Sequence, residues 1–468
     1  MSTTAELAVA VHKHLIKLKA GARFPRSSPK SAIPDASVLR NVFDVVYHAS
    51  LKTEEGKSVI ARLCVVDPNN PEDYPPPRPR PDRWAIVPLA SRFPLNVATL
   101  VKIAQAADPW SSSLAVYYDA GGSFFIWGLI DQAVRWNRML VREGLGYDLP
   151  GLINVVANGI ADISVYRELG FLARLQQDTL IEQQNDVFWD GPVAERLQTW
   201  IEPSLESVRQ KVTPELWDSD VETPSRSYDL WIGFLCRILL SIQRYRHGGA
   251  LLLTDLNEEL FPRYKISYDR ASRHLEELAA IKIRERKNWT DLRRIIRERP
   301  NDAIPYSAYR NEFILNLADD DLEESLTGAV RFIASLSRID GLVLMRSNLK
   351  VNGFGVEIRT DEEVEKVCVS SAPNLAPASS TIIEANHFGT RHRSMMRYCY
   401  GHPDSLGFVV SQDGDIRASM RVGEEIVLWD NLKVHLLWRD DLGEAVEVSK
   451  ADEMGSSEAE KIQNEATQ

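Results

Sequence analysis

The sequence contains little cysteine, and this scarcity limits the kinds of structure that it can form. Its 468 residues include four cysteines, Cys64, Cys236, Cys368 and Cys399. No two of them form a Cys-x-x-Cys pair, which argues against a structural zinc site, and so few thiols cannot build a disulfide scaffold. We therefore expect four reduced thiols in the core of a cytoplasmic protein.

Long apolar runs are also missing from the sequence. The most apolar stretches, 123–130 and 230–242, are too short or too interrupted to span a bilayer, which requires roughly 20 residues. The N-terminus has no uninterrupted apolar signal core and is typical of a helix. These features predict a soluble, cytoplasmic protein that does not interact with a membrane.

An excess of positive charge is absent as well. Lysine and arginine number 55 against 66 aspartates and glutamates, which gives a formal net charge of −11. A general nucleic-acid binder would normally show a basic face and a high pI, so this balance argues against nucleic acid as a partner. The stretch 282–299 holds eight basic and three acidic residues, and we interpret it as a solvated helix face rather than a DNA-binding surface.

Length and composition favour a globular protein of several domains, and the local patterns of its sequence mix helices and strands. Hydrophobic residues make up 44% and charged residues 26% of the chain, which is close to the globular average. The family resemblance given at the end of this subsection implies an α+β region that resembles a sensor over 1–220 and a second domain over 225–440 with a central mixed β-sheet flanked by helices. The remaining features are a proline-rich loop at 68–81, an insertion at about 282–319, and a disordered tail at 451–468.

Local patterns place the elements within these domains. The sequence predicts helices up to about residue 60, a helix over 194–212, and one over 227–245. The acidic triplet 319–321 is interpreted as a cap at the start of a helix that ends at Leu336. Predicted strands are 84–88, 113–118, 123–130, 152–156, 160–166, 250–254, 342–345, 407–410, 416–420, 426–429 and 434–438.

Common catalytic motifs are absent: there is no phosphate loop of the Walker type, no His-Glu-x-x-His and no Gly-x-Ser-x-Gly. The run from Gly389 to Arg393 has instead the chemistry of a polyphosphate site. Gly389 allows close approach of the backbone, Thr390 offers a hydroxyl donor, and Arg391 and Arg393 offer planar forks that match phosphate oxygens. On composition alone, a basic surface turn explains the run equally well.

Two shorter elements follow an apolar helix or strand, where sites of α/β proteins gather. Asp340 precedes Gly341 at a predicted strand start, and its carboxylate could hold a divalent metal or accept a proton from a hydroxyl. The segment Ser411-Gln412-Asp413-Gly414 closes the predicted strand 407–410. Either element could also be an ordinary turn.

Taken together, residues 227–440 resemble a diadenylate cyclase domain of the type found in the DNA-integrity scanning protein. Asp340-Gly341 matches the family's Asp-Gly-Ala motif, Gly389–Arg393 matches Gly-Thr-Arg-His-Arg in full, and Ser411 opens the Ser-Glu-Glu-type motif. The segment 237–253 resembles the helix and Gly-Ala-Leu strand that begin that domain. Two positions depart from the pattern, because Leu342 stands where the family has alanine and Gln412 where it has glutamate.

The resemblance implies a metal-dependent nucleotidyltransferase of bacterial second-messenger signalling. Such an enzyme condenses two ATP molecules into cyclic di-AMP, releases pyrophosphate, and would here be controlled by the N-terminal sensor region. Asp340 would activate the 3′-hydroxyl directly or through Mg²⁺ or Mn²⁺. The phosphates would be held by Thr390, Arg391, His392 and Arg393, with Gly341 and Leu342 lining the nucleotide pocket, Gly389 and Ser411 also binding nucleotide, and Asp413 near the metal.

The two departures leave a second function open. Leu342 crowds one wall of the implied pocket, and Gln412 keeps an oxygen ligand but removes a charge. A catalytically inactive nucleotide-binding sensor of the same fold is therefore the alternative. Because the implied chemistry joins two facing ATP molecules, we expect a homodimer or a higher homo-oligomer.

Overall fold

A computed structural model describes most of the chain, and it divides into two compact units, one ending at Glu182 and the other at Val434. The described residues are 2–21, 33–69, 85–107, 112–131, 152–167, 170–182, 184–217, 223–255, 260–298, 306–375, 379–412 and 414–434. Most of the predicted proline-rich loop, Asp413, most of the predicted strand 434–438 and the predicted tail lie outside them. The boundary between the units falls before the predicted one near residue 220, because helix α5 (Gly191–Lys211) packs against α7 and α8 of the second unit.

The first unit is built on an eight-stranded sheet with the order β10-β9-β8-β7-β3-β5-β6-β4. Within the described residues its helices are α1 (Thr4–Gly21), α2 (Ala36–Ser50), α3 (Val97–Ile103) and the 3-10 turn η2 (Ala104–Ala106). Its strands are β3 (Ala61–Val65), β4 (Ala85–Pro94), β5 (Ser112–Tyr118), β6 (Phe124–Asp131), β7 (Ile153–Gly159), β8 (Asp162–Arg167), β9 (Gly170–Gln176) and β10 (Thr179–Ile181), with a separate ribbon of β1 (Thr53–Glu54) and β2 (Lys57–Ser58).

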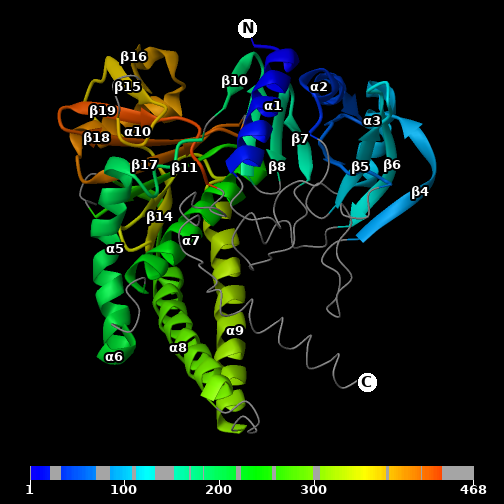
Figure 1. Cartoon of the computed structure of the whole chain (residues 1–468). Coiled ribbons are helices and arrows are strands. Elements are labelled where there is room, and N and C mark those ends of the chain that lie inside the picture. The colour runs from blue at the N-terminus through cyan, green and yellow to red at the C-terminus, as the bar shows by residue number, and fades with distance from the viewer. Residues whose placement is uncertain are drawn as a thin grey trace, which may run out of the picture. The chain divides into compact units, whose positions relative to one another are not determined.

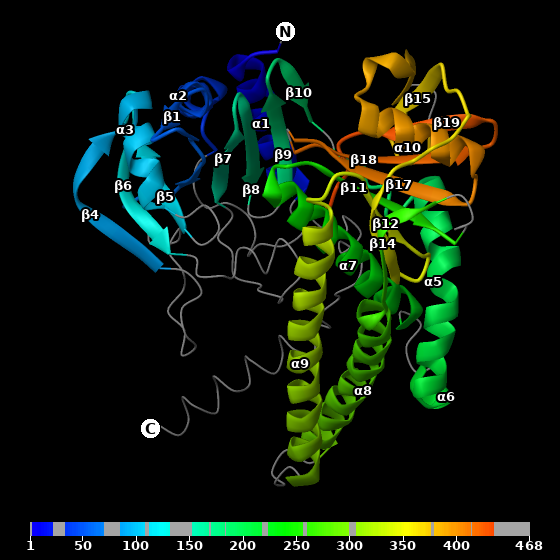
Figure 2. The ribbon, with the colours of Figure 1, turned by 180° about the vertical axis from the view of Figure 1, so that it is seen from behind.

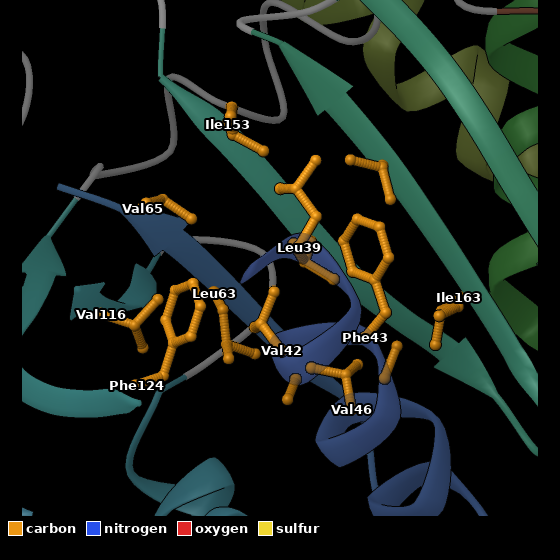
Figure 3. Packing of buried hydrophobic residues seen from close by; sticks show 14 of the residues in the cluster. Leu39, Val42, Phe43, Val46, Leu63, Val65, Val116, Phe124, Ile153 and Ile163 are labelled. Carbon is orange, nitrogen blue, oxygen red and sulfur yellow. The ribbon is translucent and has the colours of Figure 1, made fainter. Parts of the chain in front are cut away.

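Helices cover one face of this sheet and form its main core. Helix α2 presents Leu39, Val42 and Phe43 to the sheet, and these side chains pack with Leu63 and Ile163 (Figure 3). All five are fully buried. The apolar residues of α2 recur at helical spacing, so the helix buries one face against the sheet, whereas every residue of β3 is buried.

The second unit is built on a nine-stranded sheet with the order β12-β14-β13-β11-β17-β18-β19-β15-β16. Its described helices are α5, α6 (Pro214–Trp217), α7 (Thr223–Tyr245), α8 (Arg270–Glu298), α9 (Tyr306–Leu336), the 3-10 turn η4 (Ala385–His387) and α10 (Thr390–Gly401). Its strands are β11 (Gly249–Thr254), β12 (Pro262–Tyr268), β13 (Leu342–Met345), β14 (Val351–Val356), β15 (Lys366–Ser370), β16 (Ser380–Glu384), β17 (Ser405–Val410), β18 (Ile416–Val422) and β19 (Glu425–Trp429).

This sheet is mixed and lies between helices. Strand β11 runs parallel to β13 and antiparallel to β17. Helix α10 covers the face of the sheet that includes Ala250 and Leu252 of β11. Its residues Met395 and Met396 belong to the same buried cluster. On the opposite face, a Cβ built at Gly249 would meet Ile242 of α7, so α7 covers that side. The predicted fold class, a mixed sheet flanked by helices after an α+β region, is confirmed.

The predicted insertion forms a helical hairpin. Helices α8 and α9 run antiparallel and extend side by side away from the sheet (Figures 1 and 2). The interpretation of residues 319–321 as a helix cap is wrong, because they lie inside α9, which begins at Tyr306. Asp319 instead bonds to Lys282 of α8, with oxygen–nitrogen distances of 2.6 and 2.7 Å. The triplet has the composition of a cap, but tertiary pairing determines its place.

Several predicted hairpins are confirmed by the pairing of their strands. Strands β5 and β6 pair antiparallel around Gly121 and Gly122, and β7 pairs with β8 around the turn that holds Gly159. The predicted strands 407–410, 416–420 and 426–429 correspond to β17, β18 and β19, which form an antiparallel meander. In the described ranges, no helix is both long and apolar enough to span a bilayer.

Candidate functional site

Three of the predicted motif segments meet at one end of the second sheet. Strands β13, β11 and β17 are neighbours in that order. Parallel strands β11 and β13 both begin at this end, and antiparallel β17 ends there, with Gly249 opposite Val410. Asp340 therefore precedes β13 at the same edge at which Ser411 follows β17. Two strand spacings of about 4.8 Å separate these segments, so they lie roughly 10 Å apart across the sheet.

The fourth segment, the run Gly389–Arg393, reaches the same edge through Arg391, which lies against the turn before β11. Gly248 has φ +71°, and a Cβ built on it would lie 2.9 Å from Nη1 of Arg391 and 3.4 Å from the backbone nitrogen of Gln412. The Arg391 guanidinium thus lies over the glycine and beside the end of β17. A side chain at position 248 would occupy the place of this cation, which is a packing reason for glycine there, in addition to its backbone angle.

Asp340 is exposed at the entrance to β13. The next residue, Gly341, has φ +107°, and a Cβ on it would lie 2.6 to 2.8 Å from backbone atoms of Gly355 and Val356. The close approach of β14 therefore fixes the chain direction at this point and holds the Asp340 carboxylate at the sheet edge. Leu342, which follows, is buried in the core between the sheet and α10, so it packs there rather than offering a polar contact.

The run Gly389–Arg393 forms the beginning of α10. Gly389 is the N-cap residue and makes no side-chain capping bond, and the first turn contains no acidic residue. It carries Arg391 and Arg393 instead, and cations at this positive end of the helix dipole are unfavourable by about 0.3–1 kcal/mol each in the absence of an anion. The Nε atom of Arg393 is buried and has no hydrogen-bond partner among the described residues. These features suit the binding of an anion such as phosphate.

His392 is expected to help hold the phosphates, but its surroundings do not suit a positively charged side chain. Its side chain is buried, and burial together with the charges of Arg417 and Arg391 lowers its pKa to about 4. Nη1 of Arg417 donates to Nε2 of His392 over 3.4 Å, and the ring of Phe388 lies beside both residues. At neutral pH the imidazole is therefore an uncharged acceptor, and the positive charge of this turn comes from its two arginines.

Arg417 is held from its other side by carboxylates. Its Nε donates to Asp430, and its Nη2 lies 3.7 Å from an oxygen of Asp415. Strand β18 supplies Arg417, and the ends of β17 and β19 bring the carboxylates to the same edge of the sheet. This residue belongs to the site by geometry although the sequence did not indicate it, because an arginine in an alternating strand pattern is typical of an exposed strand face.

The segment after β17 forms a tight turn. The hydroxyl of Ser411 accepts from the backbone nitrogen of Asp415 at 3.0 Å, and the amide of Ser411 donates to the Asp415 carbonyl at 2.8 Å. Ser411 thus shapes the hairpin between β17 and β18 next to Arg391. Gln412 is exposed beside it. Asp413, a predicted metal ligand, lies outside the described residues.

Asp340 is the described candidate for a ligand of a divalent cation at this edge of the sheet. Among the described residues no group of three or more histidine, cysteine, aspartate or glutamate side chains could hold a metal ion. Mg²⁺ usually keeps several waters and binds through one or two carboxylates and the substrate's phosphates, so a lone exposed carboxylate is a sufficient protein contribution. Asp340 fits that mode of binding.

The comparisons with known proteins concern the first unit. The family model described as "Probable sensor domain DACNV" matches residues 28–131, which span α2 to β6. The protein therefore has a sensor region in its N-terminal part. No curated protein and no solved structure matches the chain.

Proposed function

We propose that the protein is a diadenylate cyclase, a nucleotidyltransferase that condenses two ATP molecules into cyclic di-AMP under the control of its N-terminal sensor region. The observation that carries the proposal is the convergence of Asp340, Gly248, Arg391 and Ser411 at one end of the second sheet. Separate parts of the sequence thereby contribute an acid and a phosphate-binding turn to one place. The matched sensor family before this domain suits an enzyme whose output responds to a signal.

The reaction requires positioning and charge neutralisation more than covalent chemistry. In each half-reaction the 3′-oxygen of one ATP attacks the α-phosphorus of the other, the bond to the pyrophosphate oxygen breaks, and the hydroxyl proton passes to a base. Asp340 would accept that proton. Arg391 and Arg393, with the amides at the start of α10, would hold the polyphosphate and offset the charge that develops on the leaving pyrophosphate.

A divalent cation would be held by Asp340 together with the phosphates of ATP. When bound, Mg²⁺ or Mn²⁺ supplies a positive charge that makes the 3′-hydroxyl more acidic and screens the phosphates. Neutral His392 has a different task, which is to accept from Arg417 and so fix the orientation of both side chains. The chain thus combines two arginines for the phosphates with a buried network that holds α10 against the sheet.

The direct test is to incubate the purified full chain with ATP and either Mg²⁺ or Mn²⁺ and to detect cyclic di-AMP by mass spectrometry. The wild type should form cyclic di-AMP. In Asp340→Asn the rate should fall at least about 100-fold, because general acid–base catalysis usually contributes a factor of that size or more. Nucleotide binding should persist in the variant, because Arg391 and Arg393, rather than Asp340, are proposed to hold the phosphates. The chain offers Asp255 as a matched control, since this aspartate follows β11 at the opposite end of the same sheet.

ATP binding by the wild type without product, with either metal, would contradict the cyclase proposal. That outcome would favour the second candidate, a nucleotide-binding sensor without turnover. The observation in favour of this alternative is Leu342, which fills the core behind the site and leaves less room there than the small residue of the resembled motif. If ATP does not bind at all, both candidates fail.

A further inference from the structure

The hairpin of α8 and α9 carries an exposed apolar surface in its distal part. Tyr306, Phe313 and Leu317 of α9 are 81%, 63% and 49% exposed, and Trp289 of α8 is 52% exposed. Large apolar side chains gathered on a protruding helix pair are costly in water and mark an interaction surface. Figures 1 and 2 show that both helices extend well beyond the sheet of their unit.

The exposed residues of α9 follow the spacing of a coiled coil. Steps of four and three residues alternate along one line of the helix, which is the a/d pattern that faces a partner helix. Every member of the line is exposed. We call it the α9 seam; it consists of Tyr306, Arg310, Phe313, Leu317, Asp320 and Glu324.

The contact with α8 uses a different side of α9. Glu312 accepts from Asn288, and Asp319 bonds to Lys282. Each of these two residues precedes a seam residue by one position and is therefore turned by about 100° around the helix. These two cross-hairpin bonds therefore come from residues beside the seam rather than from seam residues.

The seam is complementary to itself when two copies run antiparallel. Two antiparallel helices centred on residue 315 place Phe313 of each copy against Leu317 of the other. The same register places Arg310 opposite Asp320, so each end of the seam gains an ion pair across the two-fold axis. A parallel arrangement would instead place Arg310 against Arg310 and Asp320 against Asp320, which repel.

We propose that the α9 seam is a homodimer interface that binds the seam of a second copy of this chain in antiparallel orientation. The occupant is a second copy because the four central seam residues, Arg310, Phe313, Leu317 and Asp320, face complementary residues of the same segment when it is reversed. The seam from 306 to 324 is about 27 Å long. The proposal does not depend on nucleotide chemistry, so it can fail or hold independently of the proposed function.

The test measures the association state of the full chain by sedimentation velocity from about 1 to about 100 μM. The wild type should associate to a dimer within this range. Arg310→Glu and Asp320→Arg each create like-charge contacts and should raise the dissociation constant at least about tenfold, and Phe313→Asp should give a monomer. The double variant Arg310→Glu/Asp320→Arg restores opposite charges and should return to within about threefold of the wild type.

Arg359→Glu is the matched control, since it changes the net charge equally at an exposed arginine outside the hairpin. It should leave the dissociation constant unchanged, and far-UV circular dichroism should show that all variants keep their helices. The proposal is overturned if the wild type stays monomeric over the whole range. It is also overturned if a dimer persists unchanged in the seam variants, or if the double variant associates no better than the single ones.

Discussion

His392 shows how burial changes the role that a residue type suggests. Between two arginines in an exposed loop it would share their charge, but here it is buried under Phe388 and Arg417. Desolvation and the two neighbouring cations, Arg417 and Arg391, lower its pKa to about 4. Because the neutral ring accepts from Arg417, the residue connects the first turn of α10 to β18, and its contribution is one of position.

The low pKa of His392 predicts a dependence of stability on pH. An unfolded histidine titrates near 6.5, so between this value and about 4 the unfolded chain binds more protons than the folded one. The free energy of unfolding should therefore fall as the pH decreases through this window, and the part due to His392 is about 2 kcal/mol between pH 7 and pH 5.

Chemical denaturation of the wild type and of His392→Gln at these two pH values measures that part. Glutamine keeps an acceptor for Arg417 but does not titrate, so the variant should lose about 2 kcal/mol less than the wild type on acidification. An equal loss in both proteins would mean that the imidazole is not held neutral by burial.

The turn before β11 allows a matched comparison of two glycines. Gly248 and Gly423 both have positive φ, +71° and +59°, but a Cβ at Gly423 would meet nothing within 4 Å, whereas one at Gly248 would meet Arg391. Each change to alanine should lower the stability by about 1 kcal/mol through backbone strain. Only Gly248→Ala should also weaken ATP binding, by at least about tenfold, since it displaces a charge-assisted phosphate contact.

Isothermal titration of both variants with ATP, beside the wild type, checks this expectation. Equal ATP affinities for Gly248→Ala and Gly423→Ala would show that the position of Arg391 over Gly248 has no role in binding. Weakened binding in both would attribute the effect to strain in the sheet rather than to the displaced guanidinium.

At the scale of helices and strands, some elements could be predicted well from the sequence and others could not. Strands β5–β6, β7–β8 and β17–β19 were predictable because short apolar runs rich in β-branched and aromatic residues are separated by turns with glycine in or next to them. Strands β12 and β16 were not predicted; both lie at edges of the sheet, and most of their residues are exposed or only partly buried. The acidic triplet at 319–321 was misread because a carboxylate cluster suits a cap and an ion pair with Lys282 equally well.

The candidate site was predictable only in part. Asp340, Arg391 and Ser411 could be named from their motifs, but the sequence could not show that Gly248 lies beneath Arg391 or that Arg417 reaches His392. Those contacts join residues far apart in the chain and depend on the order of the strands in the sheet. No local pattern carries that information.

At the scale of the whole molecule, each unit has a hydrophobic core of its own. The sensor family matches only the first unit, and the candidate nucleotide site lies entirely in the second. Such separate cores predict two thermal transitions rather than one, because each unit can unfold without the other. A ligand of the second unit should raise one of them selectively.

Calorimetry of Asp340→Asn with ATP tests this separation, since the variant should bind the nucleotide without consuming it. At ATP concentrations about 100 times the dissociation constant, binding should add about 2.7 kcal/mol to the stability of one unit. One transition should therefore move to higher temperature while the other stays in place. A single transition that shifts as a whole would show that the units unfold together.

We proposed that the second unit joins two ATP molecules, and the ratio of pyrophosphate to cyclic di-AMP is the sharpest test of this proposal. Pyrophosphate and cyclic di-AMP are quantified together as the wild-type protein consumes ATP with Mg²⁺ or Mn²⁺. Two pyrophosphates should form for each cyclic di-AMP, and both products should be lost in Asp340→Asn. Release of phosphate and ADP, or bound ATP that remains unchanged with both metals, would contradict it.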